Sequence, residues 1–430
     1  MINWLLVGYM WLIVHRPHEI WNFLAGYRVV QMYMIVLIAV WLFSLVSSEK
    51  RPLGNVFTLA LASYILAIAA ATLFSPFTNI FEDGPLHTWL RYSVFFVILM
   101  TSVKTERDLK IIVTGFAIVT FLYMVDSYRG YMRGIAHYSG GAWRLVGRSN
   151  TFGDPNEYGT FIVCALPFVI PLLVLCRKYW HYLFILGYIL LSLRSVMLTG
   201  SRGAFIMVIA LGITLILFSR HRFKLLPIVL IAGMIGWTVM PDDLRNRYRT
   251  LWMDDVAELS IDDVRRAEAN IEGRTEGFWG GLELWGDYPL FGVGPGQFGT
   301  ARGHGYRTHN LVGEVTGELG TFGVLTFLFL LACFGINHYN IWKNYKYLQE
   351  KNLEKEGRYC WWVSIGVMYA IFMALVQGFS LHNAFWFYWV WFGAFQALAA
   401  TLMQEKVLDA MQGKLRPSLP EIPVKNRVTF

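Results

Sequence analysis

The chain has 430 residues, of which 56% are hydrophobic and only 15% are charged, and its mean hydropathy is +0.45. Soluble globular proteins of this length are far less apolar, so the composition excludes that class and indicates a polytopic membrane protein. The formal net charge of +8 does not indicate nucleic-acid binding. Much of it lies in predicted cytoplasmic loops and in the C-terminal tail, where anionic membrane lipids are the usual partner.

Apolar runs long enough to cross about 30 Å of hydrocarbon as helices recur along the whole chain. We expect an all-α fold with about twelve spans, near residues 2–14, 28–47, 53–75, 88–103, 108–127, 157–176, 180–198, 203–219, 223–240, 310–336, 359–378 and 384–404. The first run lacks a basic segment and a small-residue cleavage site, so we expect a retained helix rather than a signal peptide. Spans 1 to 9 then occupy residues 1–240, a long outer loop residues 241–309, spans 10 to 12 residues 310–404, and a cytoplasmic tail residues 405–430.

The distribution of basic residues predicts the orientation, because short cytoplasmic loops collect Lys and Arg. With both termini in the cytoplasm, all twelve lysines from Lys50 to Lys425 fall on the cytoplasmic side. The outer loops then contain arginine and no lysine, with eight arginines in residues 241–309 alone. A planar guanidinium holds phosphate or carboxylate through two parallel hydrogen bonds, so these arginines predict an anion site. The alternative is that they have no chemical role and that the bias reflects only the topological rule for basic residues.

The long outer segment contains one predicted amphipathic helix. The letters "SIDD" at 260–263 match a capping box, so a helix is expected to begin there. Ile271, Phe278, Leu282 and Trp285 form an apolar stripe that suits a helix on the membrane surface. Arg274 lies at the edge of this stripe. Its side chain either extends toward water, as arginines at apolar surfaces often do, or has a functional role. The glycine-rich "DYPLFGVGPGQF" at 287–298 follows and predicts a tight turn that approaches a ligand closely.

Four motifs in order carry a family resemblance. They are "GRSNTFGDPNEYG" (147–159), "TGSRGAF" (199–205), "EGRTEGFW" (272–279) with "DYPLFGVGPGQF", and "THNLVGEVTGELGTFGVLTF" (308–327). Over residues 147–335 the sequence resembles the O-antigen ligase and O-antigen polymerase superfamily. The resemblance implies a GT-C-like glycosyltransferase of the bacterial inner membrane that moves a glycan from undecaprenyl pyrophosphate to an acceptor hydroxyl on the periplasmic face. It implies no cofactor and no metal, and direct displacement would invert the anomeric carbon.

The resemblance also implies the catalytic residues, because the family uses an arginine of the SRG-type turn, an arginine of the long outer loop and a histidine before the next span. The matching positions are Arg202, Arg274 and His309. Arginines suit a diphosphate that gains charge as it leaves, and an imidazole that titrates near 6.5 can take a proton at neutral pH. His382 in "SLHN" is the competing candidate for the base.

Further substrate-binding candidates surround these three. Asn310, Glu314 and Glu318 recur at i, i+4 and i+8 and are expected on one inward helix face, with structural acids paired to arginines as the alternative. Gly313 and Gly317 form a small-xxx-small pair that lets a neighbouring helix come close. The remaining candidates are Arg91, Arg148, Asn156 and His382.

The sequence leaves several alternatives open. Lipid A core, another glycan repeat and a protein hydroxyl all suit the same base, so a polymerase or a protein O-oligosaccharyltransferase is as compatible with the motifs as a ligase. A metal-dependent enzyme would use outer acids such as Glu82–Asp83, Asp242–Asp243, Asp254–Asp255 and Asp262–Asp263. A flippase for lipid-linked sugars is the alternative from another class, although transporters usually have two related halves, which are not visible here.

Overall fold

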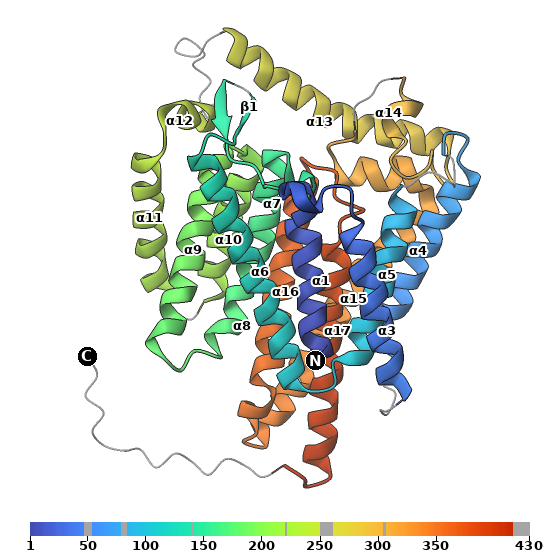
Figure 1. Cartoon of the computed structure of the whole chain (residues 1–430), viewed down its shortest axis with the longest axis vertical. Helices are drawn as coiled ribbons and strands as arrows, with labels where there is room; N and C mark the ends of the chain where they lie inside the picture. Colours follow the sequence, from blue (N-terminus) through green and yellow to red (C-terminus); the bar gives the residue numbers. More distant parts are fainter. Residues whose placement is uncertain are drawn as a thin grey trace.

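The computed structural model describes residues 1–46, 54–78, 84–139, 141–219, 222–249, 261–303 and 307–415. Its helices form an upright bundle with one long helix, α13, lying across one end, as Figure 1 shows. The N-terminus and the end of the last helix, α17, lie at the opposite end of the bundle (Figure 1). Ser260, the expected start of the capping box, and the acids Glu82–Asp83 and Asp254–Asp255 lie outside the described residues.

A helix occupies each of the twelve expected positions. These helices are α1 (Ile2–His15), α3 (Val29–Val46), α4 (Val56–Phe74), α5 (Pro85–Ser102), α6 (Glu106–Met132), α7 (Pro155–Ala165) continued by α8 (Val169–Leu173), α9 (Tyr179–Thr199), α10 (Arg202–Phe218), α11 (Arg222–Val239), α15 (Leu311–Glu350), α16 (Glu354–Gly378) and α17 (Tyr388–Met411). Seven candidate spans among the described residues are long and apolar enough to cross a membrane. This supports an all-α multi-pass membrane protein, whereas twelve crossings and a GT-C-like arrangement remain predictions.

The remaining elements are short and connect these helices. They are α2 (Pro17–Ile20), η1 (Asn22–Leu24), the antiparallel pair β1 (His137–Ser139) and β2 (Ala142–Arg144), η2 (Asn150–Phe152), η3 (Leu166–Phe168), α12 (Asp242–Arg249), α13 (Ile261–Asp287) and α14 (Phe298–Ala301). The expected span 157–176 is interrupted at η3, because Pro167 and Pro171 each lack the amide hydrogen that a continuous helix requires.

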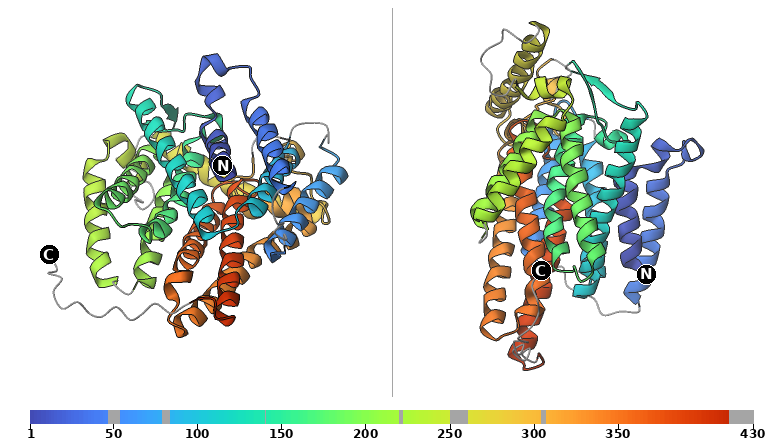
Figure 2. Two further views of the ribbon diagram at one scale, coloured as in Figure 1. Left: turned by 60° about the horizontal axis from the view of Figure 1, so that its bottom comes forward. Right: turned by 90° about the vertical axis from the view of Figure 1, so that its left-hand side faces the viewer.

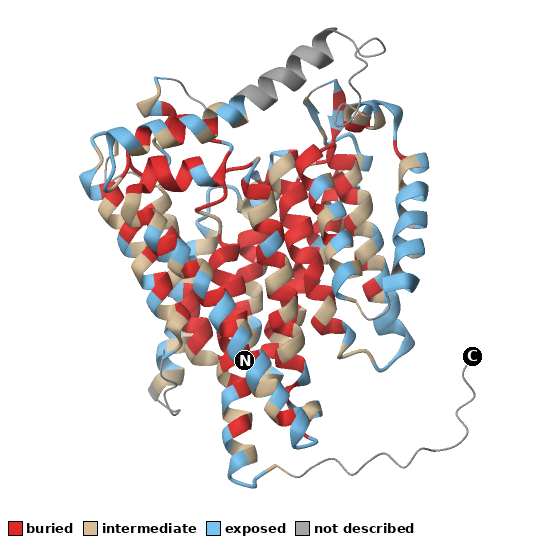
Figure 3. Ribbon diagram, turned by 180° about the vertical axis from the view of Figure 1, so that it is seen from behind, coloured by how far each residue is buried: buried red, intermediate tan, exposed pale blue. Residues whose placement is uncertain are grey.

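The core lies where α15 packs against α4, α16 and α17. Buried residues gather in the middle of the bundle, whereas α11 is exposed along its length (Figure 3). The side view in Figure 2 places α1 and α3 at one edge of the bundle and α13 across its end.

The expected straight span 310–336 is wrong in one respect, because α15 breaks at Gly320, whose φ of 63° and ψ of −162° are not helical. A break frees main-chain groups that must find other partners. The amides of Thr321 and Phe322 donate to the carbonyls of Pro289 and Leu290 at 2.8 and 3.2 Å. In return, the amides of Val293 and Gly294 donate to the carbonyls of Gly317 and Glu318 at 2.9 and 3.0 Å. The main chain of the glycine-rich loop thus packs against the break in α15, and its approach to a ligand remains a prediction.

The predicted close approach at Gly313 and Gly317 is confirmed, and its partner is α13. A Cβ at Gly281 would lie 2.3 Å from Gly313 Cα, and one at Gly277 would lie 1.5 Å from the Thr308 carbonyl oxygen. Two G-x-x-x-G pairs, one on each helix, therefore bring the backbones into direct contact. This contact fixes α13 against the segment that leads into α15.

Candidate functional site

The turn that carries Arg202 is fixed by its main chain. Helix α9 ends at Gly200, whose φ of 57° suits glycine, and Ser201 Oγ accepts a hydrogen bond from the Ala204 amide at the start of α10. Arg144 Nε donates to the Thr199 carbonyl at 2.6 Å, and Arg247 Nε donates to the Gly200 carbonyl at 2.8 Å. Arg202 is the first residue of α10 and is buried.

Arg144 also links this turn to α7. Its Nη2 donates to Asn156 Oδ1 at 2.9 Å, and Asp154 caps α7 by accepting from the Asn156 and Glu157 amides. The side chain of Asn156, a predicted substrate contact, is therefore held in position by its hydrogen bond with Arg144. Burial, followed by the charge of Arg247, lowers the pKa of Arg144 to about 9.

Arg274 comes to the same place from α13. Burial lowers its pKa, and the positive charges of Arg202 and Arg247 lower it further. Among the described residues Arg274 has no carboxylate partner. Arg202, Arg247 and Arg274, called the arginine group below, thus concentrate positive charge where three separate elements meet. The structure brings together the two predicted arginines and adds Arg247, which the motifs did not single out.

His309 lies at the edge of this group in a constrained backbone conformation. Its φ of 44° lies in the left-handed region, which costs a residue other than glycine on the order of 1 kcal/mol. The conformation is imposed from both sides, because Thr308 packs against Gly277 and Asn310 Oδ1 accepts from the Gly313 amide at 3.1 Å. As a whole residue His309 keeps contact with solvent, while its imidazole is partly covered and lies beside the His382 ring. Desolvation lowers its pKa below 6.5, and the charges of Arg274 and Arg307 lower it further while Asp154 opposes them.

His382, the competing base, lies beside His309 with the ring centroids 5.3 Å apart. Arg307 Nη1 lies 3.0 Å from His382 Nε2, and because a guanidinium can only donate, Nε2 is the acceptor. Burial, then the charge of Arg307, lowers the pKa of His382 to about 3. The lone pair of His382 that would accept a proton is therefore already engaged, which favours His309 as the base.

The two buried glutamates both bond to the main chain of loops. Glu314 Oε2 accepts from the Ala384 amide at 2.8 Å, and Glu318 Oε2 accepts from the Gly296 amide at 2.5 Å. Of the alternative with acids paired to arginines, the structure has the charge of Arg307 acting on both carboxyl groups, without a direct ion pair. Asn310 also bonds the main chain, through its cap and through Nδ2 to the Phe379 carbonyl at 3.4 Å. These three side chains fix the loops around His309.

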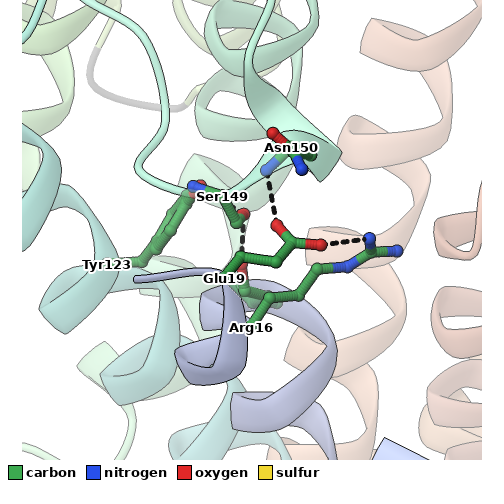
Figure 4. Close-up of polar contacts among 6 residues, drawn as sticks. Arg16, Glu19, Tyr123, Ser149 and Asn150 are labelled. Atoms are coloured by element: carbon green, nitrogen blue, oxygen red, sulfur yellow. Dashed lines mark hydrogen bonds and ion pairs between the residues drawn. The ribbon is translucent and has the colours of Figure 1, made fainter. Parts of the chain in front are cut away.

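Arg148 and Arg91 were predicted to contribute to the same anion site. Arg148 Nε instead lies 3.7 Å from Asp126 Oδ2 of α6, and Arg91 is exposed on α5. The chain after Arg148 is anchored to the N-terminal helices, as Figure 4 shows: Glu19 Oε2 accepts from the Asn150 amide at 2.7 Å, and Ser149 Oγ donates to the Val14 carbonyl at 3.0 Å. This anchor positions the motif that leads into α7.

Several other outer arginines bind the protein itself. Arg245 donates to the carbonyls of Thr238 and Met240 and pairs with Asp242 at 3.0 Å. Arg302 pairs with Glu276 and Glu283 at 2.7 and 2.5 Å. Part of the arginine preference in the outer loops thus reflects bonding to carbonyls and carboxylates within the fold.

Comparison with known families identifies the segment that contains the site. Residues 160–328 match the family model described as O-Antigen ligase. A search of curated proteins gives no match. The matched residues include Arg202, Arg274, Arg307 and His309, and members of the family are membrane glycosyltransferase-like enzymes of ligase or polymerase type. The chain therefore carries an O-antigen ligase domain over residues 160–328, and this domain supports membership of the O-antigen ligase superfamily.

Proposed function

We propose that the protein is an O-antigen ligase that transfers a glycan from undecaprenyl pyrophosphate to a hydroxyl of the lipid A core, at the periplasmic face of the bacterial inner membrane. The convergence of Arg202, Arg247 and Arg274 beside His309 carries this proposal. After burial, the charges of Arg202 and Arg247 lower the pKa of Arg274, so these guanidiniums repel one another. A diphosphate would relieve that repulsion and accept bidentate hydrogen bonds from them.

The proposed reaction needs a leaving-group clamp and a base. His309 takes the proton of the acceptor hydroxyl as its oxygen forms a bond to the anomeric carbon. The bond from that carbon to the phosphate oxygen breaks on the opposite side, so the anomeric configuration inverts. The charge that develops on the departing undecaprenyl pyrophosphate is stabilised by the arginine group. The sugar is already activated in the donor, so the reaction balances without a nucleotide or a cofactor.

Reconstitution tests the proposal directly. The purified full chain in proteoliposomes would receive a labelled undecaprenyl-pyrophosphate glycan and, in separate reactions, rough lipopolysaccharide, a second donor molecule or a serine-containing peptide. Label on rough lipopolysaccharide with release of undecaprenyl pyrophosphate supports a ligase. Label on a second donor indicates a polymerase, and label on the peptide indicates a protein O-oligosaccharyltransferase. Intact donor in all three reactions overturns the proposal.

Conservative variants test the arginine group. Arg202→Lys and Arg274→Lys keep the charge but lose bidentate geometry, so each should reduce kcat/KM by the equivalent of about 2–4 kcal/mol of transition-state stabilisation. Arg245→Lys is the matched control, because Arg245 bonds carbonyls and Asp242 away from the group. Normal turnover in both variants would mean that these arginines supply only generic charge or packing.

A further inference from the structure

Arg307 supplies positive charge at the site from a second direction. It lies two residues before His309, in a stretch that leaves the glycine-rich loop and enters α15. Its contact is with His382, and the ring of His382 lies against the ring of His309. The charges that act on Arg274 are those of Arg202 and Arg247, whereas the charges of both Arg274 and Arg307 act on His309. The imidazole of His309 therefore has the arginine group as one cationic neighbour and Arg307 as another.

The charge of Arg307 acts on the carboxyl groups of Glu157, Glu314 and Glu318, but none of them forms an ion pair with it. The side chain is exposed and forms no ion pair with a described carboxylate, and its one hydrogen bond goes to His382 Nε2 at 3.0 Å. His382 is 8% exposed and neutral as the acceptor of that bond, so it removes none of the charge. A guanidinium has five N–H donors, which leaves the others of Arg307 available to a ligand.

The neighbouring groups restrict the ligand further. Glu157 Oε1 lies 3.8 Å from His382 Nε2, the same nitrogen that Arg307 Nη1 contacts at 3.0 Å, so a carboxyl group also faces this edge of His382. His382 Nδ1 is buried and has no hydrogen-bond partner among the described residues. Arg307 is thus a positioned cation, anchored through a neutral imidazole, beside the residue that would deprotonate the acceptor.

We propose that Arg307 is a specificity-determining residue that binds a carboxylate or phosphate group of the acceptor glycan close to the reacting hydroxyl. This inference rests on the proposed function, since it takes His309 as the residue facing the acceptor. The arginine group would match the two phosphates of the donor, and the N–H donors of Arg307 that His382 does not engage would serve a second anion. The second anion belongs to the acceptor, because the acceptor hydroxyl is the group that must lie against His309. An acceptor sugar with an acidic substituent would be selected over its neutral counterpart.

Binding measurements on the full chain in nanodiscs separate the two anion sites. With inorganic pyrophosphate saturating, glucuronic acid and glucose 6-phosphate should bind, as measured by saturation-transfer NMR, and glucose should bind at least about tenfold more weakly. Arg307→Gln should weaken binding of both acidic sugars by about tenfold or more while leaving pyrophosphate affinity unchanged. Arg274→Gln should show the reverse pattern, and Arg245→Gln should change neither.

Each result decides between the possibilities. Pyrophosphate binding by Arg307→Gln shows that the variant is folded, and Arg307→Lys should recover part of the preference for acidic sugars. The inference is overturned if acidic sugars bind no better than glucose, if they bind Arg307→Gln as well as the unmodified protein, or if pyrophosphate displaces them from a shared site. If substitution of Arg202 or Arg274 left pyrophosphate affinity unchanged while Arg307→Gln still weakened binding of the acidic sugars, the result would count against the proposed donor site alone.

Discussion

Substitution of Gly277 by alanine tests whether the contact between α13 and the segment before α15 sets the geometry of the site. The added Cβ would lie 1.5 Å from the carbonyl oxygen of Thr308, the residue before His309. Real Cβ atoms essentially never approach another heavy atom within 3.0 Å, so the two backbones must separate until 1.5 Å becomes at least 3.0 Å. Main-chain atoms on both sides leave no flexible side chain to give way.

That separation moves Arg274, on α13, relative to His309. A misplacement of about 1 Å between groups that must act together costs roughly 10²-fold in rate, so we expect Gly277→Ala to lose about that factor in kcat for glycan transfer. Gly273→Ala is the matched control, because it adds the same methyl to the same helix next to Arg274 and meets no atom within 4 Å. Both substitutions replace glycine by alanine within α13 and so stabilise the helix equally, by about 1 kcal/mol. Any difference in activity between the two variants is therefore due to packing.

The assay is transfer of labelled glycan in proteoliposomes, with thermal unfolding and size-exclusion chromatography to establish that both variants are folded. Gly281→Ala, whose Cβ would lie 2.3 Å from Gly313 Cα, should give a loss in the same direction. Activity of Gly277→Ala within about threefold of Gly273→Ala would refute the reasoning, since a displacement of this size could not then matter to catalysis.

Three further predictions concern orientation, the base and the loop anchor. In a cysteine-free background, a cysteine at Asn246 should react with an impermeant thiol reagent added from outside and one at Asn352 should not; the reverse pattern would invert the topology. The transfer rate should fall at acid pH with an apparent pKa below 6.5, because desolvation and nearby arginines favour neutral His309. Arg274→Gln should shift this fall in rate to higher pH; an unchanged pH profile would mean that the charge of Arg274 does not act on the base. Glu19→Gln should lower the free energy of unfolding by about 0.5–2 kcal/mol, since it weakens the acceptor for the Asn150 amide; an unchanged melting temperature would show that the anchor adds no stability.

Patterns along one helix predicted much of this structure. Runs of apolar residues located the helices, because crossing a bilayer and packing in a bundle both require continuous hydrophobic surface. The small-xxx-small pair at Gly313 and Gly317 correctly indicated a close neighbour, because the absence of Cβ atoms is a local property. The motifs around Arg202, Arg274 and His309 were identified through a family resemblance. In the structure Arg202 begins α10, Arg274 lies on α13 and His309 lies just before α15, and the charge of Arg202 acts on Arg274, whose charge acts on His309.

Features that depend on partners far away in the sequence were not predictable. The sequence did not predict that Glu318 accepts a hydrogen bond from the Gly296 amide, 22 positions earlier in the chain, in a loop. The break at Gly320 was hidden in an apolar run, because the carbonyls of Pro289 and Leu290 that make it tolerable lie in a loop. Arg307 was one of eight arginines in its segment, and only its contact with His382 distinguishes it.

The outer arginines that bond carbonyls also contribute to the electrostatics of the site. Arg247 is held by the Gly200 carbonyl, and its charge still lowers the pKa of Arg274. Arg144 is held by Thr199, and neighbouring guanidiniums together with burial lower its pKa to about 9. The fold therefore holds several mutually repelling cations in fixed positions before any substrate arrives. Charge that is already oriented would require no reorganisation as the proposed diphosphate departs, and under this condition electrostatic stabilisation of a transition state is largest. An anion bound here would gain, besides its hydrogen bonds, the relief of the repulsion among these fixed guanidiniums.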